Sequence, residues 1–120
     1  MRNASLAAVI LLLAAAGCAT PVDDLPAPVR NRISEFESVP PARPPRSVYR
    51  TEYRGQPAYF ITPACCDSPS ELYDGQGALI CYPGGGFAGG GDKRCPGYGL
   101  PASASLVWQD RRGGKGREGK

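Results

Sequence analysis

Four closely spaced cysteines constrain the fold of this 120-residue chain more than any other feature. Cys65, Cys66, Cys81 and Cys95 lie in one stretch, a fifth cysteine stands alone at Cys18, and the sequence has no histidine. If the chain is exported and Cys18 is lipidated, as the N-terminus indicates below, four cysteines remain. An even set of cysteines in an exported chain predicts two disulfides. A bond between the neighbours Cys65 and Cys66 would strain disulfide geometry. We therefore expect Cys65–Cys81 with Cys66–Cys95, or Cys65–Cys95 with Cys66–Cys81.

The N-terminus has the layout of a secretory signal. A basic residue, Arg2, precedes an apolar run over residues 6–16, which is too short to span a membrane. The following "LAAAGC" resembles a bacterial lipobox, in which cleavage before the cysteine leaves that residue lipidated. This resemblance predicts a signal peptide over residues 1–17 and lipidation of Cys18. The alternative is an ordinary signal that is cut near Ala19 or Thr20.

Residues 18–46 read as a proline-rich linker. Seven prolines favour an extended, semi-rigid chain that would hold a domain away from a membrane surface. One interruption, with Ile33 and Phe36 at helical spacing, predicts a short helix over residues 32–38, capped by Asn31. The helix must end before Pro40, since the residue that precedes a proline disfavours helical backbone.

The rest of the chain predicts a small, mainly-β fold: a disulfide-stabilised antiparallel β-meander. Two β-rich runs, 48–53 and 58–62, flank a glycine-bearing turn and predict a hairpin. A turn over Asp74–Gly77 precedes a buried strand over Ala78–Tyr82, and Ser105–Asp110 reads as a last strand with Trp108 as an anchor. Four aromatic residues of the hairpin are expected in the core rather than on a carbohydrate-stacking platform: Tyr49, Tyr53, Tyr59 and Phe60.

The predicted cysteine-rich β domain covers residues 47–111. A core of this size is marginal by itself, and two disulfides would each contribute roughly 3 kcal/mol. The formal charge of +3 comes from the C-terminus, because residues 18–110 hold eight basic and ten acidic side chains. The glycine-rich basic stretch 112–120 is predicted to be a disordered tail. Its alternative role is attraction to anionic lipid or polysaccharide. We expect no nucleic-acid partner.

The motifs of the cysteine-rich segment give little support to metal or nucleotide binding. Zinc sites need closely paired ligands, whereas here two isolated cysteines follow one adjacent pair. Gly84, Gly86 and Gly89 match G-x-G-x-x-G, but no helix is expected after them, as a dinucleotide site requires. We expect these glycines to let the backbone pass tightly between disulfides and to supply positive φ. No cofactor is predicted.

Two aspartates are the remaining candidates for chemistry. Asp74 and Asp92 stand beside glycines and could supply oxygen ligands to calcium, although no EF-hand spacing exists. Alternatively, they bond to nearby backbone N–H groups and hold turns. Without histidine there is no Ser-His-Asp or Cys-His pair. Catalysis would fall to a carboxylate pair, as in glycosidases.

The pattern "PACCDSPSELYDGQGALICYPGGG", followed by "GGGDKRCPGY", resembles a family of small bacterial exported proteins and lipoproteins known only as a domain of unknown function. The resemblance covers about residues 33–111, including the lead-in hairpin and the closing "LVWQDRR". Lys93 departs from it, since the family tends to have a glycine there. The matching positions are Cys65, Cys66, Asp67, Leu72, Tyr73, Asp74, Ile80, Cys81, Pro83, Gly84, Gly85, Gly91, Asp92, Cys95 and Pro96. The family implies no known activity.

These observations predict an uncharacterised cell-envelope lipoprotein acting as a small binding or structural module. It would face the periplasm from the outer membrane, with a membrane, envelope-protein or polysaccharide partner, because Ala19 is not the aspartate that retains such proteins inside. One alternative is an inhibitor of an extracytoplasmic enzyme that presents the Gly-rich loop over residues 83–94. A second alternative is a small hydrolase that uses Asp74 and Asp92.

Overall fold

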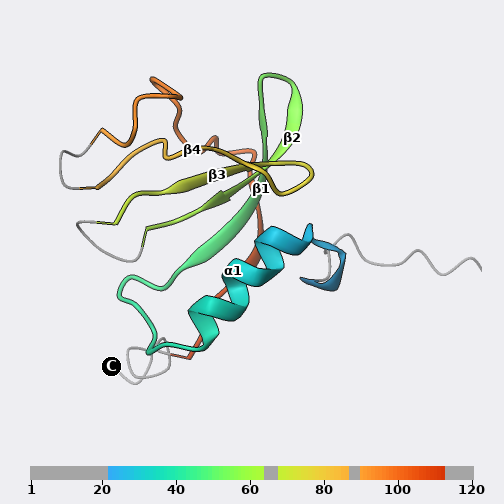
Figure 1. Cartoon of the computed structure of the whole chain (residues 1–120), viewed down its shortest axis with the longest axis vertical. Helices are drawn as coiled ribbons and strands as arrows, with labels where there is room; N and C mark the ends of the chain where they lie inside the picture. Colours follow the sequence, from blue (N-terminus) through green and yellow to red (C-terminus); the bar gives the residue numbers. More distant parts are fainter. Residues whose placement is uncertain (1–21, 64–67, 87–89, 113–120) are drawn as a thin grey trace, which may run out of the picture.

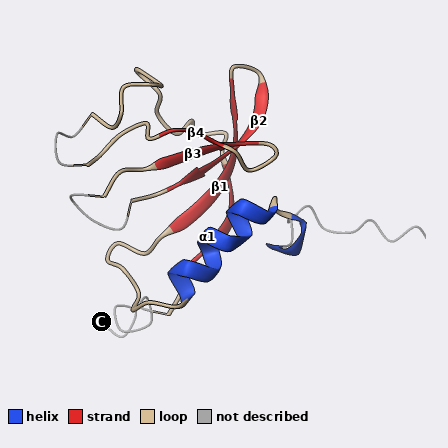
Figure 2. Ribbon diagram, in the orientation of Figure 1, coloured by secondary structure: helices blue, strands red, loops and turns tan. Residues whose placement is uncertain are grey.

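The computed structural model describes residues 22–63, 68–86 and 90–112, which form one antiparallel sheet and one α-helix (Figures 1 and 2). The expected fold class is confirmed: the protein is mainly β, with a short N-terminal helix and a disulfide. In chain order the elements are a 3-10 helix Val22–Asp24, α1 Ala27–Glu37, β1 Ser47–Tyr53, β2 Gln56–Ile61, β3 Glu71–Asp74, β4 Leu79–Cys81 and β5 Ser105–Gln109.

The five strands are ordered β4-β3-β2-β1-β5. The first four form the expected meander, and the last strand returns to pair with β1. The predicted hairpin is β1–β2, which turns at Arg54 and Gly55, both with positive φ. Strand β3 was not predicted, because its four residues are too few to show an alternating pattern.

Helix α1 covers one face of the sheet. Its buried residues Val29, Ile33 and Phe36 recur at helical spacing and join the core cluster that includes Val48 and Ile61. Residues 22–37 therefore belong to the folded domain, which differs from the expected linker over residues 18–46.

The helix also begins earlier than the predicted 32–38. It follows Pro26 and carries Pro28 in its first turn, where the missing N–H costs nothing and the fixed φ suits a helix. Asn31, the expected cap, lies inside the helix. The helix ends at Glu37, before Pro40, as expected.

The other face of the sheet holds a second, smaller core of Ala58, Leu72, Cys81 and Cys95. Side chains alternate between the faces of a strand, so Leu72 points away from the helix that its neighbour Tyr73 contacts. Among the hairpin aromatics, Tyr59 is buried under the helix. Tyr53 and Phe60 pack against this second core together with Tyr98, and Tyr49 is half-buried.

The disulfide joins Cys81 to Cys95. Both expected pairings are wrong, since each gave Cys81 and Cys95 partners at Cys65 and Cys66. Strand β4 places Cys81 on the second core, and the loop that follows brings Cys95 back onto the same core with a Cα–Cα distance of 6.1 Å. Local spacing could not reveal this return, which depends on how the loop folds over the sheet.

Arg112 fastens the end of the domain to α1. Its guanidinium donates to the carbonyl oxygens of Phe36, Glu37 and Val39, and it also binds the buried Asp110 carboxylate at 2.8 and 3.0 Å. The Phe36 and Glu37 carbonyls belong to the last turn of α1, where no residue four positions further along the helix is present to donate to them. The tail predicted over residues 112–120 therefore does not begin at Arg112, which is a structural residue.

Several sequence predictions lie outside the described residues. They are the signal peptide 1–17, lipidation of Cys18, the cysteines Cys65 and Cys66, Gly89 and the segment 113–120. Within residues 22–63, 68–86 and 90–112, no helix is long and apolar enough to cross a membrane.

Replacing both Cys81 and Cys95 with alanine should lower the free energy of unfolding by about 3 kcal/mol, because the bond closes a loop with a sequence separation of 14. Urea denaturation measures the change. If the free energy of unfolding falls by less than the error of its extrapolation to zero urea, the bond does not constrain the unfolded chain.

Asp110→Asn should destabilise the protein at neutral pH but have less effect in acid. The Arg112 guanidinium lowers the pKa of Asp110 below its ordinary 3.8, against the opposing effect of burial. This contribution to stability is present above pH 3.8 and is lost as the pH falls through the lowered pKa. Urea midpoints of the wild type and the variant, measured from pH 7 downward, should converge in that acid range. In an Arg112→Ala background the gap should be smaller throughout, and a gap independent of pH would contradict the assignment.

Candidate functional site

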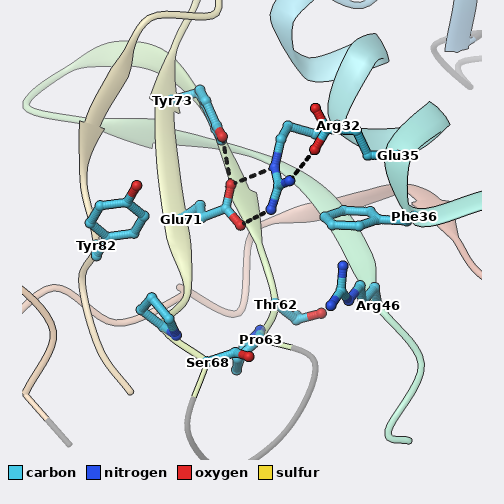
Figure 3. Close-up of a pocket in the computed structure, with 11 residues that line it drawn as sticks. Arg32, Glu35, Phe36, Arg46, Thr62, Pro63, Ser68, Glu71, Tyr73 and Tyr82 are labelled. Carbon is cyan, nitrogen blue, oxygen red and sulfur yellow. Dashed lines mark hydrogen bonds and ion pairs between the residues drawn. The ribbon is translucent and has the colours of Figure 1, made fainter. Parts of the chain in front are cut away.

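A cleft opens between the second half of α1 and the strands that it covers (Figure 3). Its volume is about 480 Å³, within the usual range for sites that hold small ligands. Charged, hydroxyl and aromatic side chains line it, and they come from α1, the sheet and the segments that enter and leave the strands: Arg32, Glu35, Phe36, Arg46, Thr62, Pro63, Ser68, Pro69, Glu71, Tyr73 and Tyr82.

Glu71 is the centre of the polar network in this cleft. Its carboxylate accepts Nε of Arg32 at 2.9 Å on Oε1 and a terminal nitrogen of Arg32 at 2.6 Å on Oε2. The Tyr73 hydroxyl donates to Oε1 at 2.5 Å (Figure 3). Arg32 also pairs with Glu35, one turn further along α1. The forked Arg32–Glu71 contact is the strong, directional form of an ion pair.

Regular local geometry brings these groups together. Glu71 and Tyr73 are two residues apart on β3, so they project from the same face of the sheet. Pairing with β2 sets Glu71 opposite Ile61, on the face that α1 covers. Arg32 and Phe36 are four residues apart on α1 and therefore share one face of the helix.

Burial and the Glu71 hydrogen bond both raise the pKa of the Tyr73 hydroxyl. The pKa of Arg32 is raised as well, chiefly by its hydrogen bond to Glu71. At neutral pH Tyr73 is therefore a neutral donor and Arg32 is a cation. The Glu71 oxygens already accept these donors, so this network acts as a rigid floor for the cleft rather than as a general base.

Arg46, which directly precedes β1, lines the cleft beside Phe36. Its guanidinium carbon lies 4.3 Å from the centroid of the Phe36 ring, and that of Arg32 lies 4.6 Å from the same centroid. Trp108 stacks with Phe36 at 6.2 Å between centroids. The buried Phe36 ring thus fixes two cations next to the cleft.

The aspartates singled out in the sequence hold turns. Oδ1 of Asp74 accepts the N–H groups of Gln76 and Ala78, and Oδ1 of Asp92 accepts that of Arg94. The turn-holding alternative is confirmed for both. No cluster of three or more metal-ligating side chains occurs in the part of the chain that the structure describes. Cys81 and Cys95 are oxidised and offer no thiolate.

The glycine-rich loop is shaped by close backbone contacts, and of the two described glycines of the G-x-G-x-x-G match Gly86 has the expected positive φ whereas Gly84 does not. Gly85 and Gly91 both have positive φ, and a Cβ on Gly91 would lie 2.0 Å from the carbonyl oxygen of Tyr82. Gly84 is bonded to Ser70 through its N–H at 3.0 Å and its carbonyl at 2.9 Å. No helix follows in residues 90–104, so the dinucleotide motif lacks its required context. Lys93 also adopts positive φ.

Sequence reasoning did not select the residues that line this cleft. Two signals were available: the Arg32–Phe36 spacing on the helix and the Glu71–Tyr73 spacing on the strand. Neither predicts a cleft, because only the packing of α1 on the sheet brings Arg32 within bonding distance of Glu71.

The fold and the cleft define a small, disulfide-bonded, mainly-β domain with one helix packed on its sheet. A family model described as Domain of unknown function (DUF6970) matches residues 34–110, and the chain belongs to this family. The match includes most of the cleft and begins just after Arg32. No curated protein and no solved structure matches the chain.

Glu71→Gln should lower the free energy of unfolding by about 2 kcal/mol, because it leaves the part-buried Arg32 without its main counter-charge. Glu35→Gln is the matched control. It removes the other partner of Arg32, whose side chain is 61% exposed, and should cost at most about 0.5 kcal/mol. Urea denaturation of both variants tests the difference, and equal losses would show that Glu71 is not the anchor of the network.

Proposed function

We propose that the protein is a lipid-anchored binding module of the bacterial cell envelope, attached through Cys18, with the cleft around Glu71 and Arg46 as its binding site. The cleft is the observation that carries the binding role. Its walls come from α1, the sheet and the adjoining segments, and its floor is fixed by the Arg32–Glu71–Tyr73 network. A site that is already rigid loses little entropy when it binds a ligand. The proposed anchor rests on the "LAAAGC" sequence.

The position of Val22 limits the distance between the folded domain and a lipid on Cys18. The described domain begins at Val22, which packs against the core cluster beneath α1. The chain from Cys18 to Val22 can span at most about 14 Å. A lipid on Cys18 would therefore hold the domain against the membrane surface, with the start of α1 nearest to it, rather than at the end of a long spacer.

The opposite end of α1 would then face away from the membrane. Arg112 is bonded to the last carbonyl groups of this helix, about 16 Å from its first residue. The basic segment after Arg112 would accordingly leave the domain on the side away from the anchor.

Intact-mass analysis of the mature protein from bacterial membranes tests the anchor. We expect a diacyl or triacyl mass on a chain that begins at Cys18. Cys18→Ala should abolish the lipid mass and release the protein from the membrane fraction. Ala19→Asp should keep the lipid but retain the protein in the inner membrane. An unmodified mature chain that begins at or after Ala19 would overturn the proposal.

A further inference from the structure

Arg46 is the charged side chain of the cleft that has no ion-pair partner among the described residues. Arg32, Glu35 and Glu71 are joined to one another by ion pairs. Within the described residues the guanidinium of Arg46 forms no hydrogen bond or ion pair, and only the backbone carbonyl of this residue is bonded, to the N–H of Asp110. Asp110 is close enough for Arg46 to contribute to its lowered pKa, but the Asp110 carboxylate is bonded to Arg112.

A cation–π contact holds the Arg46 guanidinium next to the cleft while leaving its donors available. Its central carbon lies over the Phe36 ring at 4.3 Å from the centroid, and no N–H of the group is used in a hydrogen bond to a described residue. Held against a ring that is itself buried, the group loses less freedom on binding than an exposed arginine would. An arginine in this setting is suited to bind a planar oxyanion through two parallel hydrogen bonds.

Hydroxyl groups add further donors to the cleft. Thr62 is not one of them, because its hydroxyl accepts the N–H of Ser47 at 2.8 Å and donates to the carbonyl oxygen of Ser47 at 3.4 Å. Ser68 and Tyr82 line the same cleft, and no described residue forms a hydrogen bond with either hydroxyl. Figure 3 shows Tyr82 beside Glu71, across the cleft from Arg46.

The charge balance of the cleft limits the charge of its ligand. Two arginines and two glutamates are among the described residues that line it, and their formal charges sum to zero. A single negative charge would be compensated by Arg46, which has no ion-pair partner in the described part of the chain. A second negative charge would approach Glu35 and Glu71 without a further cation. This favours a carboxylate over a doubly charged phosphate.

We propose that the cleft binds a small molecule or chain end through a single free carboxylate, which Arg46 receives through its two-pronged donor edge. This proposal rests on the cleft being the binding site, as proposed above, and names the chemical class that the site takes. The volume of about 480 Å³ leaves room for an uncharged body beside Phe36 and Tyr82. Arg46 is then a binding residue, while Arg32, Glu71 and Tyr73 are positioning residues.

Titration of the full mature chain carrying Cys18→Ala tests this assignment without any need for lipid. The probes are N-acetyl-phenylalanine and its neutral amide, followed by ¹⁵N NMR of the arginine Nε signals. The carboxylate should shift the Arg46 signal saturably and bind about tenfold more tightly than the amide. Arg46→Gln should remove this preference, while Arg43→Gln, which changes an exposed arginine of the same segment, should leave it intact.

Three results would overturn the carboxylate site: equal binding of acid and amide, an unchanged preference in Arg46→Gln, or no saturable shift with the acid. Tighter binding of phenyl phosphate than of N-acetyl-phenylalanine would also overturn it. Arg46→Lys keeps the charge but loses the fork, so intermediate affinity is expected. The intact-mass analysis tests lipidation of Cys18 independently of ligand binding. A lipidated protein that ignores the acid would refute the carboxylate assignment while leaving the anchor standing.

Discussion

The packing of α1 on the sheet is the interaction on which the rest of the structure depends. Val29, Ile33 and Phe36 are almost fully buried, and burying side chains of this size contributes about 1.5–3 kcal/mol each. Together they exceed the roughly 3 kcal/mol expected from the Cys81–Cys95 bond. The domain is therefore held chiefly by a helix–sheet core, and the disulfide secures the loop on the opposite face.

The cleft follows from that packing. Where the apolar contacts of α1 end, Arg32 reaches across to Glu71, and the ion pair closes the space between helix and strand. Removing charges from water offsets much of the gain from such a pair, so its clearest effect is on geometry. It fixes the helix relative to β3, which sets the position of Phe36 and, through the stacked ring, of Arg46. Arg112 fixes the far end of the same helix.

Much of the fold could be predicted from local pattern. The β1–β2 hairpin, the Asp74–Gly77 turn and the final strand are marked by β-rich runs and turn residues, and the structure contains all three. The extent of α1 was harder to predict, because Pro26 directly before the helix and Pro28 in its first turn resemble a linker until the buried positions are known. Strand β3 was missed because its four residues are too few to show an alternating pattern, and its pairing with β2 and β4 is what defines it.

By itself, the sequence determined the mainly-β class, the family and the backbone needs of the glycine-rich loop, since each depends on residues close together in the chain. Only the tertiary structure decided which cysteine Cys81 meets, that α1 belongs to the core, and that Arg32, Arg46, Glu71 and Tyr73 surround one cleft. These residues come from elements far apart in the sequence. Their meeting depends on which face each element buries and how the strands pair, and no short stretch of sequence records that choice.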